Sequence, residues 1–305
     1  SDCLVGSEMC IRDRTMSDIG SDGVLAGVKE LSPIQKLAMH GLVFLIIFGG
    51  WEVGARLGYV NELILPAPTS IAYRLYEMFF VTGSIYWHYI ITMYEATMGF
   101  IIGVSIGMGL AITAAISPVF RRYWAPYAVV FNVTPGIAVT PFIIAWFGFG
   151  WSSKIALAAL VCFFPPFINT LTGLLHIDKD ATELFRSLGS TKKQFFWKCQ
   201  IPSALPIIIA GLKLAMTGAL IGTIVAQFFS ASEGVGILMQ RFAFRLNMDG
   251  SFAALIVMSL MGLSLFTLME YMDYKVLYWR RHSRMEEVGS KRKRKWFAEN
   301  GDFSA

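Results

Sequence analysis

Long runs without a charged residue constrain the fold of this chain more than any other feature. These runs contain no Asp, Glu, Lys or Arg, and they are Ala96–Phe120, Tyr123–Ser153, Ile155–Ile177, Leu214–Ser232 and Ser251–Met269. A helix that crosses a bilayer needs about 20 apolar residues, and each run is near or above that length. Only 15% of the chain is charged, whereas soluble domains carry about 25%. The sequence therefore predicts an integral membrane protein.

The same runs predict an all-α, polytopic membrane protein with about six transmembrane helices. A transmembrane barrel would show alternating segments of about ten residues, whereas these runs are continuous. A further span fits ahead of them, although Glu52 and Arg56 lie at its end. The expected spans are residues 37–57, 90–116, 126–148, 153–174, 206–229 and 252–277.

The segments outside the spans predict the topology. Lys and Arg accumulate on the cytoplasmic side of membrane proteins. If both termini are cytoplasmic, most of the 26 Lys and Arg residues fall on that side. We therefore expect an N-terminal cytoplasmic tail at 1–36, a transmembrane domain at 37–280 and a basic cytoplasmic tail at 281–305. Residues 1–15 lack periodicity and precede Met16, so we expect them to be foreign to the protein.

Charge and cysteine usage indicate no other class of partner or cofactor. The net charge of +5 follows from the topology, and the run Lys291–Lys295 fits a solvated tail near anionic lipid heads better than a nucleic-acid site. The 4 cysteines and 4 histidines show no metal-ligand spacing. We expect no metal, no cofactor, no catalytic residue and no nucleic-acid partner.

Glycine and alanine recur at every fourth position in two of the expected spans. The two series are Gly99, Gly103, Gly107, Ala111 and Ala115 in one span, and Gly211, Ala215 and Ala219 in another. Small residues at this spacing let helix backbones approach closely in lipid. We expect close helix packing, with the lining of a translocation path as the alternative.

Prolines mark the expected third span and the loop ahead of the second. Pro135 and Pro141 free backbone carbonyls, which a membrane tolerates where protein or a water-filled cavity surrounds them. We expect either a flexible helix that lines a path or a kink that serves packing.

In the earlier loop, Thr69–Phe80 predicts a short amphipathic helix, which could lie in the membrane interface.

A polar, basic loop at 181–206 separates two apolar runs. Asp178 can cap a helix over 181–188 that places Leu184 and Leu188 on one face, and Gly189 permits a left-handed turn after it. Residues 191–200 predict a second short helix, which we expect Pro202 and Pro206 to end. Its exposed apolar surface would need a partner, although packing on its own bundle is the alternative.

This loop resembles the EAA signature of ABC importer permeases. Glu183-Leu184-Phe185 is followed after three residues by Gly189, and Cys199-Gln200-Ile201-Pro202 follows nine residues later. The spacing matches, while both alanines of the signature are replaced and Cys199 stands at its first aliphatic position. Four further segments resemble the nitrate/sulfonate/taurine branch, namely Leu65–Pro68, Pro141–Gly148, Phe164–Thr170 and Gly234–Gly236. The resemblance covers about residues 37–280.

The resemblance implies a permease of type I ABC importer architecture in a bacterial cytoplasmic membrane. Such a permease works as a homodimer with two cytoplasmic ATPase subunits and an extracytoplasmic substrate-binding protein. It implies ATPase-coupling residues in the loop, namely Glu183, Leu184, Phe185, Arg186, Leu188, Gly189 and Pro202. Polar and proline residues of the spans are candidates for the translocation path, namely Thr134, Pro135, Thr140, Asn169, Thr223 and Gln227.

The same resemblance implies a small anion such as nitrate, a sulfonate, taurine or bicarbonate as the substrate, with a vitamin or pyrimidine precursor as the alternative. No phosphate-binding Gly-x-x-x-x-Gly-Lys-Ser/Thr motif occurs in the chain, so ATP hydrolysis belongs to a separate subunit. An ion-coupled secondary transporter would carry more ionisable residues in its spans than Glu95 and Lys213 near span ends. An intramembrane enzyme would need paired catalytic groups at membrane depth, and the sequence does not suggest any.

Overall fold

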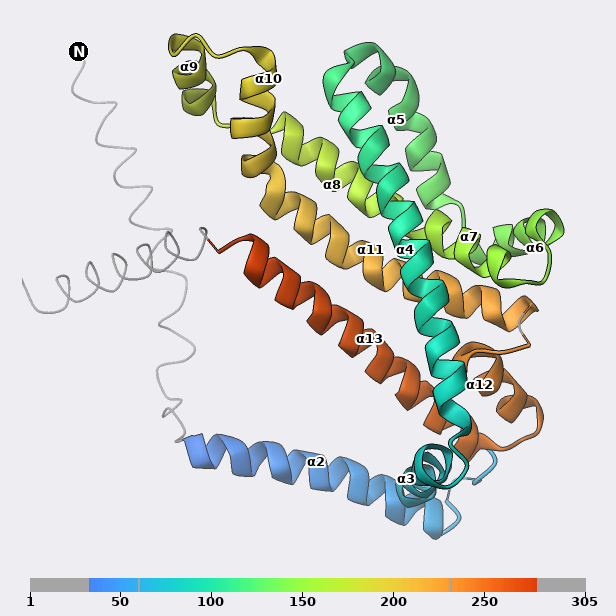
Figure 1. The fold of residues 1–305 in the computed structure, drawn as a ribbon. Helices are drawn as coiled ribbons and strands as arrows, with labels where there is room; N and C mark the ends of the chain where they lie inside the picture. Colours follow the sequence, from blue (N-terminus) through green and yellow to red (C-terminus); the bar gives the residue numbers. More distant parts are fainter. Residues whose placement is uncertain (1–32, 60, 231, 279–305) are drawn as a thin grey trace, which may run out of the picture. The chain divides into compact units, whose positions relative to one another are not determined.

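The computed structural model describes residues 33–59, 61–230 and 232–278, and regular structure in these ranges is entirely helical (Figure 1). The basic tail expected at 281–305 and nearly all of the tail expected at 1–36 lie outside the described residues. The chain divides into two compact units at residue 60. The first unit contributes the helix α2 (Pro33–Arg56), which covers residues 37–56 of the first span expected at 37–57.

The second unit holds the other helices. In chain order they are α3 (Pro68–Tyr76), the π-helical turn η1 (Glu77–Val81), α4 (Ser84–Ile116), α5 (Pro118–Val133), α6 (Gly136–Phe147), α7 (Trp151–Cys162), α8 (Phe164–Leu175), α9 (Lys179–Ser187), α10 (Lys192–Phe195), the π-helical turn η2 (Phe196–Gln200), α11 (Ile201–Ser230), α12 (Val235–Phe244) and α13 (Met248–Val276).

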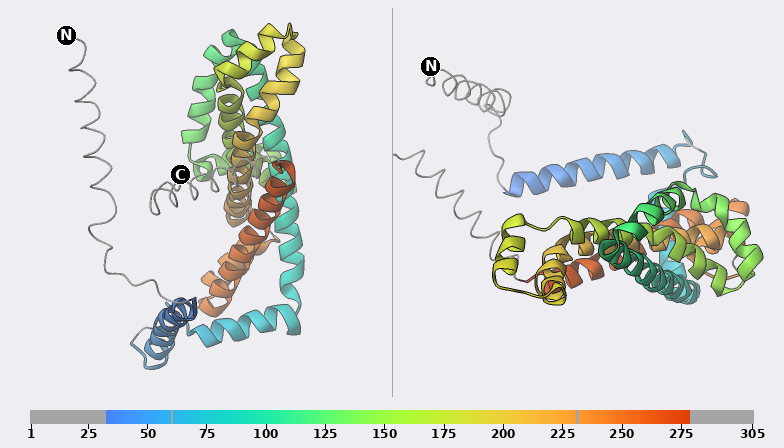
Figure 2. Two further views of the ribbon diagram at one scale, coloured as in Figure 1. Left: turned by 90° about the vertical axis from the view of Figure 1, so that its left-hand side faces the viewer. Right: turned by 90° about the horizontal axis from the view of Figure 1, so that it is seen from above.

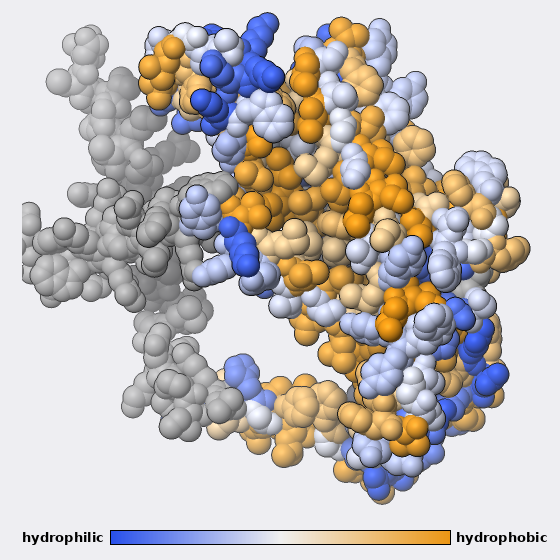
Figure 3. Space-filling model, in the orientation of Figure 1, coloured by the Kyte–Doolittle hydropathy of each residue, from blue (hydrophilic) through white to orange (hydrophobic). Residues whose placement is uncertain are grey.

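The predicted polytopic α-helical class is confirmed. In the described residues, 5 helical stretches are long and apolar enough to cross a membrane, with α7 and α8 together forming one of them (Trp151–Leu175), and the bent pair α5–α6 makes up to 6 if it forms one span. Hydrophobic residues dominate the flank of the helix bundle in the second unit, whereas hydrophilic residues gather toward its two ends (Figure 3). This distribution is the one expected of a bundle whose sides face lipid.

The third expected span is not one continuous helix. Helix α5 ends at Val133, α6 begins at Gly136, and the two are bent by 99° at this break. Thr134 and Pro135 both have extended backbone angles. A residue that precedes proline is disfavoured in the helical conformation, which explains why the break falls at Thr134. Pro141, by contrast, lies inside α6.

The prolines at the start of the fifth span do not interrupt it, which corrects the sequence-based expectation. A single helical stretch runs from Lys192 to Phe229 through α10, η2 and α11. Pro202 lies at the start of α11 and Pro206 lies inside it. The π turn η2 widens the helix directly before Pro202, so the chain continues where a regular turn would meet the proline ring.

Close backbone packing accounts for both series of small residues. Helices α4 and α11 pack against α7 and α8. A side chain on Gly103 would meet the Ala159 carbonyl oxygen at 2.6 Å, and one on Gly211 would meet the Asn169 side chain at 2.6 Å. The expected helix-packing role is therefore confirmed for both ridges.

The expected amphipathic helix is also present, as α3 continued by η1. This segment runs across the ends of α4 and α13 (Figure 2). Ile71 and Met78 are buried on its inner side. Helix α3 packs against α13, and η1 packs against α4.

Candidate functional site

The loop between α8 and α11 folds into a short helical hook at one end of the bundle (Figure 1). The Asp178 side chain accepts a hydrogen bond from the backbone N–H of Asp180 at 3.2 Å and caps α9, as predicted. Gly189 has φ +67, and the N–H of Ser190 bonds back to the Phe185 carbonyl at 3.1 Å. The left-handed conformation explains why glycine occupies this turn.

The hook has two arms, α9 and α10, and the second arm is fixed to the bundle. Thr191 and Gln194 form a reciprocal capping box at the start of α10. The Phe185 and Phe195 rings meet edge to face with centroids 5.8 Å apart, so the two arms contact each other. Gln200 Nε2 donates to the Leu174 carbonyl at 2.6 Å, which ties the arm to the end of α8.

Most loop residues that the sequence singled out lie on the outside of this hook. Leu184 is 57% exposed, Leu188 is 73% exposed and Trp197 is 61% exposed. The exposed set also includes Glu183, Arg186 and Gly189, whereas Phe185 and Pro202 are half-buried. Apolar side chains that project from a short hook at the end of a bundle form a surface suited to a partner protein.

The break between α5 and α6 opens onto a cavity. The cavity has a volume of about 600 Å³ and is lined by Thr134 and Pro135 together with Asn132 and aromatic residues such as Phe131 and Trp146. Two of the six path candidates therefore lie side by side in one concave site. The walls are mainly apolar, and the polar side chains gather at the break itself.

The other path candidates lie within helix contacts. Thr140 and Thr223 are buried, and their hydroxyl groups donate to the carbonyls of the preceding turn at 2.9 and 3.0 Å. Asn169 Nδ2 donates to the Pro165 carbonyl at 2.9 Å. Gln227 is buried near the start of α12. The structure thus does not bring the six candidates to one cavity.

A second constellation lies at the end of the bundle that carries α12. Three successive backbone N–H groups, those of Gly234–Gly236, each meet a side chain from another helix. The acceptors are His88 Nδ1, Thr92 Oγ1 and Gln227 Oε1, each at 2.9 Å. These side chains satisfy N–H groups that the start of α12 would otherwise leave unpaired. We call this set the α12 clasp.

A buried acid extends the α12 clasp into the bundle. Gln227 Nε2 donates to Glu95 Oε2 at 2.6 Å and to Thr92 Oγ1 at 3.0 Å. The other carboxyl oxygen of Glu95 is buried and has no hydrogen-bond partner among the described residues. Sequence reasoning missed the roles of His88, Thr92 and Glu95. The resemblance singles out Gln227 and Gly234–Gly236 separately, and Glu95 within an otherwise apolar helix is a further signal of this network.

The lysines of the spans also have partners. Lys154 Nζ donates to the carbonyls of Phe149 and Gly150 at 2.7 and 3.0 Å. Lys213 Nζ pairs with Asp273 Oδ2 at 2.5 Å, which links α11 to α13. Partnering of this kind lowers the cost of an ionisable group in a membrane.

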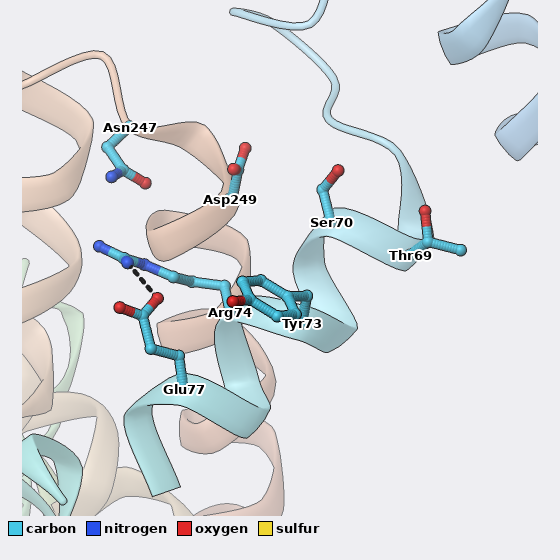
Figure 4. Close-up of a pocket in the computed structure, with 7 residues that line it drawn as sticks. All are labelled: Thr69, Ser70, Tyr73, Arg74, Glu77, Asn247 and Asp249. Atoms are coloured by element: carbon cyan, nitrogen blue, oxygen red, sulfur yellow. Dashed lines mark hydrogen bonds and ion pairs between the residues drawn. The ribbon is translucent and has the colours of Figure 1, made fainter. Parts of the chain in front are cut away.

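A polar pocket of about 400 Å³ lies beside α3 (Figure 4). Arg74 Nη1 pairs with Glu77 Oε2 at 2.5 Å, and its guanidinium lies 5.4 Å from the centre of the Phe242 ring. Asn247 and Asp249 come to the pocket from the start of α13. Within the described ranges, no group of three or more His, Cys, Asp or Glu side chains could hold a metal ion.

Comparison with known proteins places the chain among transport permeases. Residues 99–278 match the family described as binding-protein-dependent transport system inner membrane component. The aliphatic sulfonates transport permease protein SsuC of Bacillus subtilis is 33% identical over 79% of this chain and 88% of its own. The formylaminopyrimidine transport permease protein ThiX of Halalkalibacterium halodurans is 32% identical over 79% of this chain and 95% of its own.

The fold is shared with a solved structure as well. The inward-facing MetNI methionine ABC transporter aligns with a TM-score of 0.52 at 17% identity, over 65% of this chain and 97% of that one. The helical hook, the polytopic fold and the sequence matches agree with one another. The chain therefore belongs to the binding-protein-dependent transport system inner membrane components, the permeases of ABC importers.

Proposed function

We propose that this chain is the membrane-spanning permease of an ATP-driven importer and is coupled to a separate ATPase through the loop 181–202. The hook formed by α9 and α10 carries this proposal, because it presents Leu184 and Leu188 away from the bundle. ATP binding favours the closed form of an ATPase pair, so an attached hook would pass that closure to the spans. The chain itself contributes no catalytic group.

The proposed assembly follows from the family. Two copies of the chain would form the path, two ATPase subunits would bind on the cytoplasmic side, and a binding protein would deliver the solute from outside. Both termini would then lie in the cytoplasm of a bacterium, and the chain would sit in its inner membrane. The cavity at Thr134 and Pro135 is the best-supported part of the path, because the broken helix brings the polar residues Asn132 and Thr134 to one concave site there.

The proposed substrate is a small organic or inorganic anion of the sulfonate, nitrate or taurine type. The relative that transports aliphatic sulfonates supports this choice. A pyrimidine precursor is the second candidate, supported by the formylaminopyrimidine permease at nearly the same identity. Uptake of labelled taurine and of labelled formylaminopyrimidine by cells that express the complete transporter separates the two.

Substitution of Leu188 by Glu tests the coupling role of the hook. The side chain is 73% exposed, so the permease should still fold, while a charge at the docking surface should abolish co-purification of the ATPase and ATP-dependent uptake. Phe244→Glu is the matched control, because Phe244 is 81% exposed on α12, at the other end of the bundle. Normal ATPase binding by the Leu188 variant would contradict the proposal.

A further inference from the structure

The bond between His88 and Gly234 fixes the chemical state of the His88 ring. A backbone N–H can only donate, and the Gly234 N–H lies 2.9 Å from His88 Nδ1. Nδ1 therefore carries a lone pair, and the ring hydrogen sits on Nε2. A second proton would occupy Nδ1, which would leave two donors facing each other and no hydrogen bond.

His176 offers the opposite arrangement in the same chain. Its Nδ1 lies 3.0 Å from the Thr172 carbonyl oxygen, which can only accept. The hydrogen of this ring is therefore on Nδ1, and a second proton on Nε2 leaves the bond intact. The two histidines thus differ in whether protonation breaks their hydrogen bond to the backbone.

The His88 side chain is not fully enclosed by the protein. The ring is half-buried in the first turns of α4, near the end of the bundle. Arg241 of α12 and Glu233 of the loop before α12 act on it electrostatically. Glu95 lies two turns further along α4, with Lys154 of α7 acting on that carboxyl group, and Glu77 belongs to the adjoining turn η1. Arg241 and Glu233 thus contribute one charge of each sign to the surroundings of the ring.

We propose that His88 is a positioning residue that holds the first N–H of the α12 clasp only while its ring is neutral, so that acidification releases the Gly234 end of the clasp. Thr92 and Gln227 bind the N–H groups of Val235 and Gly236. Loss of the bond to His88 therefore frees Gly234, the first of the three bound residues. The pH dependence belongs to this clasp and does not depend on the proposed ATP coupling.

The first test compares melting temperatures of the complete purified transporter at about pH 7.5 and about pH 5.5, on either side of the ordinary imidazole pKa near 6.5. The unfolded chain takes up a proton that the intact clasp excludes, so wild-type stability should fall as the pH falls. In His88→Asn, Oδ1 can accept in place of Nδ1 and does not titrate. The melting temperature of His88→Asn should therefore fall less than that of the wild type, by about 2 °C or more.

The control is His176→Asn. Its melting temperature should fall between the two pH values by as much as that of the wild type. An equal fall in melting temperature in the wild type and in His88→Asn would overturn the proposal. A wild-type melting temperature that does not fall with pH would overturn it as well.

A second measurement needs no variant. Amide hydrogen exchange at Gly234–Gly236 in the wild-type complex, corrected for the intrinsic effect of pH, should be faster at about pH 5.5 than at about pH 7.5. Unchanged protection would overturn the proposal even if His88→Asn failed to assemble. Neither measurement uses ATP, so failure of this proposal is distinguishable from failure of the proposed transport function.

Discussion

At the scale of single residues, the α12 clasp explains why glycine occupies two positions at the start of α12. A Cβ on Gly234 would lie 2.4 Å from Gln227 Nε2, and one on Gly236 would lie 2.9 Å from Gln227 Oε1. Gly234 also has φ +116, a region that side chains with a Cβ rarely adopt. Gly234 therefore needs glycine for two reasons: the Gln227 amide lies close to it, and its backbone adopts an unusual conformation.

Gly234→Ala should therefore destabilise the protein by about 1–3 kcal/mol, since the added methyl group overlaps Gln227. The lowered stability would appear in thermal or denaturant unfolding of the purified protein. Gly148→Ala is a matched control, because Gly148 has φ +77 but has nothing within 4 Å of the added carbon. If both variants lose the same stability, backbone strain alone explains the glycine.

At the scale of helices, close contact between α4 and α7 sets the strictest requirement on sequence. Gly103→Leu should prevent this contact, because even a Cβ would lie 2.4 Å from Cys162 Sγ and 2.6 Å from the Ala159 carbonyl oxygen. We expect loss of folded protein in a detergent size-exclusion profile. Gly109→Leu, six residues along the same helix and with nothing within 4 Å, should retain that profile. Similar profiles for both variants would contradict this packing.

Helices could be predicted from the sequence largely because hydrophobic length and small-residue spacing are local signals. The spans, the amphipathic helix α3 and the turn at Gly189 all follow from such signals. The break at Thr134 was harder to predict, because a proline in a membrane helix is compatible with either a kink or a complete break. Gln227 and Gly234–Gly236 were named from the sequence, but their contact with α4 was missed because partners such as Thr92 and Gln227 are 135 residues apart.

At the scale of the whole molecule, the ion pair between Lys213 and Asp273 joins α11 to α13. Either Lys213→Asp or Asp273→Lys alone should lower stability and uptake, because each places two like charges together within the bundle. The charge-exchanged double variant should recover part of both losses. Melting temperature and substrate uptake measured for all four proteins test this, and strictly additive losses would contradict a direct pairing.

The helical stretch between Lys192 and Phe229 has no break along its length. Its 38 residues correspond to about 57 Å of α-helix, which is longer than the hydrocarbon thickness of a bilayer. The capping box at Thr191 lies at one end of this rod and Gln227 lies near the other. Because no loop interrupts this helical stretch, a displacement of α10 would be transmitted directly to the end that carries Gln227.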